Sequence, residues 1–136
     1  MKTILVLEDE PSLVKLWRHA LTLNGYAIWE AANAEDAIRR FLVDANRQID
    51  LLLAGVTLPV SSGILVALLL RAEVPGLRVI LTSGSPRTEW ETQDTADLDR
   101  LGSDSVIVLQ KPFKNQTLLN SVRELTEVPS AAAGTG

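Results

Sequence analysis

The chain has 136 residues, of which 46% are hydrophobic and 22% charged, with a formal net charge of -4 and no cysteine. These values predict one globular domain, exclude disulfides and thiolate metal sites, and argue against nucleic acid as a partner. The apolar stretch at residues 64–70 is too short to cross a bilayer, and the N-terminus lacks a secretory signal. We therefore expect a cytoplasmic domain that binds neither nucleic acid nor membrane.

Short apolar, β-branched stretches alternate with segments that have helical spacing. The expected strands are residues 3–7, 27–30, 51–54, 78–82 and 105–109. The first helix is predicted from Pro11, which suits a first turn, to a stop at Asn24-Gly25. Its inner face repeats every three or four residues, at Leu13, Leu16, Trp17, Ala20 and Leu21.

The later helices have similar signals. Asn33 is expected to cap the second helix, and Ser61 or Ser62 the third. Apolar spacing predicts inner faces at Ala37, Ile38, Phe41 and Leu42 in the second helix and at Leu118, Leu119, Val122 and Leu125 in the last. The acidic segment 83–104 offers only Leu98 and Leu101 to seat a short helix ending at Gly102. Its Trp90 is interpreted as an exposed anchor for a partner. We expect one domain over residues 1–126 and a disordered tail over 127–136.

This alternation predicts an α/β fold, a parallel sheet with helices on both faces. In such sheets the functional cleft lies beyond the carboxyl ends of the strands. The predicted strand ends bring Glu8 and Asp9, Gly55, Thr82 and Lys111 to that edge. Carboxylates suit a hard divalent cation such as Mg²⁺, and a lysine with a hydroxyl suits a phosphoryl group. Alternatively, Glu10 only caps the N-terminus of a helix, where the helix dipole favours acidic residues, and Lys111 is only a surface charge.

Four motifs occur in this order along the sequence: LVLEDEPSL, DLLLAGVTLPVSSG, VILTSG and QKPF. With them the chain resembles the receiver domain of bacterial two-component response regulators over about residues 2–126. The resemblance implies a flavodoxin-like, five-stranded parallel sheet in the order 2-1-3-4-5. It also implies transfer of a phosphoryl group from a kinase phosphohistidine to an aspartate, assisted by Mg²⁺. Glu8 and Asp9 match the acid pair, Thr82 the hydroxyl switch, and Lys111 the lysine, with the bond to Pro112 cis in the family.

Three positions depart from the family pattern. Gly55 matches the phosphoacceptor aspartate, because Asp50, Pro59 and Gly63 fix the register, and glycine cannot form an acyl phosphate. Val108 stands at a switch position that is usually aromatic. The acidic segment 83–104 replaces part of the family's signalling face.

The loss of a carboxylate at position 55 predicts no cofactor, with at most weak residual Mg²⁺ binding at Glu8 and Asp9. Lys111 is then expected to pair with Glu8 or Asp9 directly.

The favoured hypothesis is a phosphorylation-independent docking module for signalling proteins, either a histidine kinase or a downstream effector, and not an enzyme. One alternative is a receiver that is phosphorylated elsewhere, with Thr57 and Ser83 the nearest hydroxyls, or that competes for a kinase. Another is a flavodoxin-like binder of small ligands or nucleotides. Residues 64–70 predict either a buried helix or an interface, for a homodimer or a partner.

Overall fold

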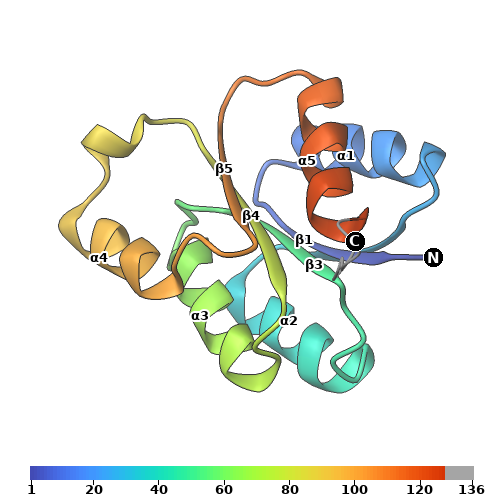
Figure 1. Ribbon diagram of the computed structural model, residues 1–136, viewed down its shortest axis with the longest axis horizontal. Coiled ribbons are helices and arrows are strands. Elements are labelled where there is room, and N and C mark those ends of the chain that lie inside the picture. The colour runs from blue at the N-terminus through green and yellow to red at the C-terminus, as the bar shows by residue number, and fades with distance from the viewer. Residues whose placement is uncertain (128–136) are drawn as a thin grey trace, which may run out of the picture.

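A computed structural model of the chain describes residues 1–127. Five parallel strands form one sheet in the order β2-β1-β3-β4-β5, which confirms the predicted flavodoxin-like topology (Figure 1). The strands are β1 (Thr3–Leu7), β2 (Ala27–Ala31), β3 (Leu51–Gly55), β4 (Arg78–Ser83) and β5 (Val106–Gln110). The order reverses beside β1, so the β1 and β3 carboxyl ends meet where a parallel sheet places its functional edge.

Helices connect the strands and cover both faces of the sheet (Figure 1). They are α1 (Pro11–Leu23), α2 (Ala34–Arg39), α3 (Gly63–Glu73), α4 (Thr92–Leu101) and α5 (Asn115–Glu127), with a π-helical turn η1 (Arg40–Asp44) after α2 and a 3-10 turn η2 (Arg87–Glu89) before α4. Asn33 and Ser62 cap α2 and α3 as predicted, because their side-chain oxygens accept hydrogen bonds from the N–H groups of Asp36 and Ile64.

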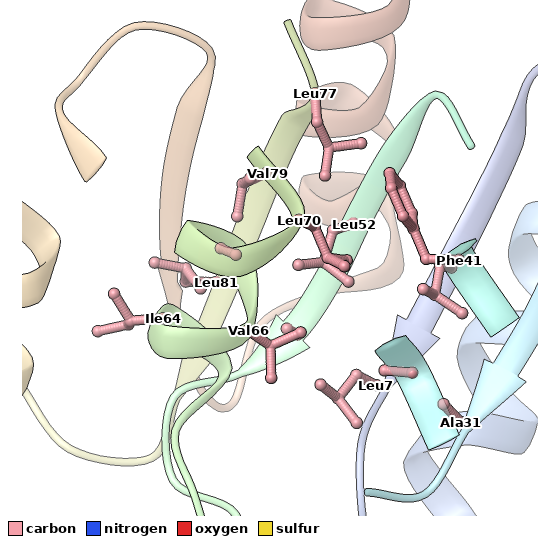
Figure 2. Close-up of a cluster of buried hydrophobic side chains, with 14 of the residues drawn as sticks. Leu7, Ala31, Phe41, Leu52, Ile64, Val66, Leu70, Leu77, Val79 and Leu81 are labelled. Carbon is pink, nitrogen blue, oxygen red and sulfur yellow. The ribbon is translucent and has the colours of Figure 1, made fainter. Parts of the chain in front are cut away.

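Two hydrophobic layers lie on opposite faces of the sheet. One packs β-strand residues against α1 and α5 and includes Trp17, Leu21 and Leu118. The other packs the opposite strand faces against α2, η1 and α3 (Figure 2). Figure 2 labels Phe41 of η1, Leu70 of α3 and Leu52 of the central strand β3, which all belong to this layer. All five β3 residues are buried, as expected for a central strand covered on both faces.

The acidic segment forms a longer helix than the sequence predicted. α4 covers ten residues and buries Leu98 and Leu101, and it ends where Gly102 adopts φ +85°, a conformation that suits glycine. α4 packs mainly against α3. Arg71 of α3 fastens this arrangement by donating hydrogen bonds to the carbonyl oxygens of Leu77, Leu101, Asp104 and Ser105, at 2.8, 3.0, 2.9 and 3.3 Å.

α5 continues through Glu127, one residue beyond the expected end of the domain. The predicted disorder of the tail concerns residues that, apart from Glu127, lie outside the described part of the chain. Within residues 1–127, no helix has the length and apolarity that a membrane span requires.

Candidate functional site

The carboxyl edge of the sheet brings together side chains that are far apart in the sequence. Gly55 ends β3 and pairs in register with Thr82 of β4. Glu8 directly follows β1, and Lys111 directly follows β5. Glu8 and Thr82 are buried, at 3% and 1% exposure. The edge therefore combines a buried carboxylate, a buried hydroxyl and a lysine around a position that has no side chain.

Lys111 and Glu8 form an ion pair across this edge. The ammonium nitrogen Nζ of Lys111 lies 3.2 Å from Oε1 of Glu8, and 3.5 Å from a carboxylate oxygen of Glu10. The other Glu8 oxygen, Oε2, accepts a hydrogen bond from the Glu10 N–H at 3.2 Å. The predicted contact between Lys111 and the acid pair is thus confirmed for Glu8. Its second carboxylate partner is Glu10, since Asp9 makes no ion pair among residues 1–127.

Burial dominates the electrostatics of Glu8. Loss of water around its carboxylate raises its pKa above the ordinary 4.5, while attraction to Lys111 and the hydrogen bonds from Lys111 and the Glu10 N–H lower it. The Lys111 side chain keeps 22% exposure, so water reaches the ammonium. The pair therefore compensates part of the cost of burying Glu8 and holds its carboxylate in place.

The space beside Gly55 is occupied by its neighbours. A Cβ atom placed on Gly55 would lie 3.2 Å from Oε1 of Glu8 and 3.5 Å from a Leu58 methyl carbon. On the helix side, a Cβ on Gly63 would lie 2.1 Å from the Gly55 carbonyl oxygen, so only glycine allows the start of α3 to approach β3 this closely. The Glu8 carboxylate consequently lies in contact with the position that a side chain at residue 55 would take.

The hydroxyl groups at the end of β4 differ in their contacts. Thr82 Oγ1 is buried and has no hydrogen-bond partner within the described residues. The Oγ atom of the next residue, Ser83, accepts hydrogen bonds from the Trp90 indole N–H and the Ser85 N–H, both at 3.1 Å. Trp90 is half-buried and packs against the core. The interpretation of Trp90 as an exposed anchor is therefore wrong, because its indole secures the β4–α4 loop.

The carboxylates at this edge do not assemble into a cation site. Across residues 1–127, no three Asp, Glu, His or Cys side chains are grouped as metal ligands would be. Glu8 is bonded to Lys111, Asp9 is exposed, and Gly55 offers no oxygen ligand from a side chain. A Mg²⁺ ion prefers several oxygen ligands in near-octahedral geometry, and the residues present do not fit that requirement.

The remaining predicted positions lie along β5 and just after it. Val108 is half-buried in the middle of β5, and the Lys111–Pro112 peptide bond is cis, as predicted. Phe113 follows and stacks on Trp17 of α1, with ring centroids 5.8 Å apart. This stacking fixes the segment that presents Lys111 to Glu8.

The family model of the response regulator receiver domain matches residues 4–123, which include every one of these positions. The chain belongs to this family. A receiver domain of the CheY-like type from Methanospirillum hungatei has the same fold, with a TM-score of 0.82 at 20% sequence identity, over 98% of this chain and 99% of that one.

Two curated relatives are longer than this receiver domain. The probable transcriptional regulatory protein TcrX of Mycobacterium tuberculosis is 35% identical over 124 residues, and the sensor kinase CckA of Brucella abortus is 27% identical over 125 residues. The match covers 90% and 92% of this chain, but only 49% and 12% of the two relatives. The likeness therefore concerns the receiver portion of each relative.

Sequence reasoning found Glu8, Gly55, Thr82 and Lys111 but missed two contributors to the site. The sequence indicates Glu10 only as an acid at a helix N-terminus, whereas in the structure it is the second partner of Lys111. The sequence signal for this role is the position of Glu10 in the LEDE motif. The contact between Ser83 and Trp90 spans a polar loop whose sequence has no periodicity that could have indicated it.

Proposed function

We propose that this receiver domain acts in two-component signalling as a protein-docking module, without phosphorylation at the usual position. Gly55 occupies the place of the phosphoacceptor aspartate in this proposal, and glycine has no group that could form an acyl phosphate. The observation that carries the proposal is the ion pair of 3.2 Å between Lys111 and Glu8, beside Gly55. The lysine that would grip a phosphoryl oxygen is already bonded to a carboxylate.

The partners follow from the family. Receiver domains interact with histidine kinases and with effectors, and one curated relative is itself a sensor kinase. We propose a protein of one of these two kinds as the partner of this chain. The domain then acts by binding, with no catalytic step of its own and no contact with nucleic acid or membrane. Binding would select one conformation of the domain, as in any population shift.

The proposal includes a prediction about Mg²⁺. An incoming ion would have to displace the Lys111 ammonium from Glu8 and would find only Asp9 as a further carboxylate of the acid pair. We therefore expect Mg²⁺ to bind weakly or not at all, and we derive no step that depends on it.

Beryllofluoride tests this function, because with Mg²⁺ it forms a phosphoryl mimic on an aspartate acceptor. Amide NMR spectra of the wild-type protein are expected to stay unchanged when both are added. The Gly55→Asp variant is expected to respond around Thr82 and Lys111, which shows that the reagent is active. A wild-type response at these same residues would mean that a second acceptor exists and would overturn the proposal.

The two alternative hydroxyl acceptors, Ser83 and Thr57, differ in their exposure and contacts. Ser83 is buried, and its Oγ is engaged by Trp90 and Ser85. Thr57 is exposed but lies outside the strand, after the β3 carboxyl end. The engagement of Ser83 supports a domain that docks without phosphorylation.

The exposed apolar face of α3 favours a second candidate function, in which the domain forms a homodimer. Ile64, Val66, Ala67 and Leu70 are buried, whereas Leu65 and Leu69 keep 43% and 48% exposure on the outer face. Sedimentation of the wild type against Leu65→Lys tests this interface. A wild-type protein that stays monomeric at high concentration would exclude it.

A further inference from the structure

A cavity of about 440 Å³ opens between the start of α1 and the segment that joins β5 to α5. Its wall is mostly apolar and consists of Leu13, Leu16, Trp17, Pro112 and Phe113. Glu10 and Lys111 complete the lining. Figure 1 shows α1 and α5 side by side on one face of the sheet, opposite α2 and α3. An apolar wall with a few charged groups is the usual composition of a site for a small molecule.

The wall has a preformed aromatic floor. Trp17 is 2% exposed, and its ring stacks on that of Phe113 with centroids 5.8 Å apart. Trp17 belongs to the hydrophobic layer beneath α1 and α5, and Phe113 packs against the same layer. Leu16, by contrast, keeps 46% exposure. A ligand therefore meets fixed rings and an apolar side chain that water still reaches, so that little ordering of the protein opposes binding.

The charged groups beside the cavity do not balance. The Lys111 ammonium lies 3.2 Å from a Glu8 oxygen and 3.5 Å from a Glu10 oxygen, so one cation serves two carboxylates. The Glu8 side chain is 1% exposed and lies outside the lining, whereas the Glu10 side chain is 58% exposed and belongs to it. Glu10 has no other cationic partner among residues 1–127. The charge of Lys111 is therefore matched by Glu8, and the surplus negative charge lies on Glu10.

This imbalance favours a cationic ligand over an anionic one. An anion would be a third acceptor for a single ammonium and would lie near two carboxylates, which repel it. A cation can pair with Glu10 and neutralise the surplus charge. Aromatic rings also attract cations, and Trp17 and Phe113 supply two rings at the wall. Lys111 therefore does not make the cavity selective for acids, although it is part of the lining.

We propose that this cavity binds a small amphipathic amine, in which an aromatic group is joined by a short chain to an ammonium group. The aromatic group lies against Leu16 and the floor of Trp17 and Phe113, and the ammonium group pairs with Glu10. Of its two carboxylate partners, Lys111 then keeps only Glu8. This inference goes beyond the docking function and does not depend on it, because neither a phosphoryl group nor a partner protein takes part.

NMR titration of the wild-type protein with 2-phenylethylamine at pH 7 tests the inference. Saturable shifts are expected for the Trp17 indole N–H and for the backbone amides of Leu16, Lys111 and Phe113, with a dissociation constant on the order of 1 mM. Two related compounds separate the contributions to binding. 3-Phenylpropionate keeps the ring but carries a negative charge, and ethylamine keeps the ammonium without the ring. Each should bind at least tenfold more weakly than 2-phenylethylamine.

Variants of the two contact types supply a second measurement. Glu10→Gln should weaken binding of 2-phenylethylamine about threefold or more, because it removes the carboxylate. Leu16→Lys should weaken it about tenfold or more, because it replaces an apolar contact by a like charge. The matched controls are Glu35→Gln, in the first turn of α2, and Leu23→Lys, at the exposed end of α1. Both lie outside the lining and should leave affinity unchanged. Circular dichroism shows whether each variant is folded.

The inference fails if 2-phenylethylamine gives no saturable shift at tenfold the expected dissociation constant, or if the shifted residues lie outside the cavity. Equal binding of 3-phenylpropionate would contradict the charge preference. Normal binding by Glu10→Gln and Leu16→Lys would contradict the assigned contacts. Self-association of the wild type that Leu16→Lys abolishes would also overturn the inference, because a second copy of the chain would then cover this cavity.

Discussion

Oε1 of Glu8 lies 3.2 Å from the point where residue 55 would carry its Cβ atom. The carboxylate after β1 therefore borders the space that a side chain at the end of β3 would enter. The Lys111 ammonium lies at the same distance from that Glu8 oxygen. A side chain at residue 55 would change both the space and the charge that Glu8 experiences.

Gly55→Asp is expected to create a Mg²⁺ site. The new carboxylate would stand beside Glu8 and Asp9, so repulsion between them should lower the free energy of unfolding without metal. Mg²⁺ should bind this set and restore stability, because a ligand that binds only the folded state stabilises it. Titration calorimetry and thermal unfolding measure both effects. Gly55→Ala adds the same Cβ without charge and should bind no Mg²⁺; equal behaviour of the two variants would contradict the prediction.

Lys111→Met is expected to destabilise the fold at pH 7 by about 1–3 kcal/mol, because it leaves the buried Glu8 carboxylate without its ion pair. Urea denaturation measures the change. Because the Lys111 side chain is partly exposed, this loss of stability should be smaller than the loss from breaking a fully buried ion pair.

The same variant should change the pH dependence of stability. Burial raises the folded-state pKa of Glu8, so the contribution of Glu8 to stability is largest when Glu8 is protonated and falls as pH rises from 4.5 through that pKa. Without Lys111 the pKa should rise further, and the deficit against wild type should shrink as pH falls toward 4.5. Glu8→Gln in the Lys111→Met background should remove this dependence. A deficit that is constant from pH 4.5 to 8 would show that Lys111 acts through packing.

Trp90→Phe is expected to cost about 1 kcal/mol, since phenylalanine keeps an aromatic ring but cannot donate to Ser83 or Ser85. Urea denaturation of Trp90→Phe, Ser83→Ala and the double variant forms a double-mutant cycle. The two single effects should be non-additive. Strict additivity would mean that the indole secures the loop through packing alone.

Arg71→Met is expected to destabilise the protein by about 2–4 kcal/mol, because carbonyl oxygens of several segments lose their shared donor. Hydrogen exchange should accelerate in α4 and at the start of β5. Arg47→Met, which breaks only an exposed pair with Glu73, is the control and should cost about 1 kcal/mol or less. Equal losses for the two variants would contradict the assigned role of Arg71.

Local signals in the sequence were enough to predict the sheet and the main site positions. The apolar run of β3, the caps at Asn33 and Ser62 and the strand-end residues Glu8 and Lys111 each depend on neighbours or on parallel topology. The length of α4 was underestimated because its burial depends on α3 and on the distant Arg71. The sequence indicates the wrong surroundings for Trp90 for a similar reason: an indole in a polar loop looks exposed until the fold brings Ser83 within hydrogen-bond distance.

The sequence also could not show which carboxylates form ion pairs with Lys111. Asp9 and Glu10 are adjacent, and only the turn between β1 and α1 decides which of them faces the lysine. The π-helical turn η1 was missed because it continues the spacing of α2, and it still buries Phe41 as that spacing requires. Such details depend on side-chain geometry that periodicity does not encode.

The intact mass of the wild-type protein after incubation with acetyl phosphate and Mg²⁺ tests the central claim most directly. With glycine at residue 55 and Lys111 bonded to Glu8, the mass is predicted to remain that of the unmodified chain, while Gly55→Asp gains one phosphoryl group under the same conditions. A wild-type protein that gains a phosphoryl group would contradict this account.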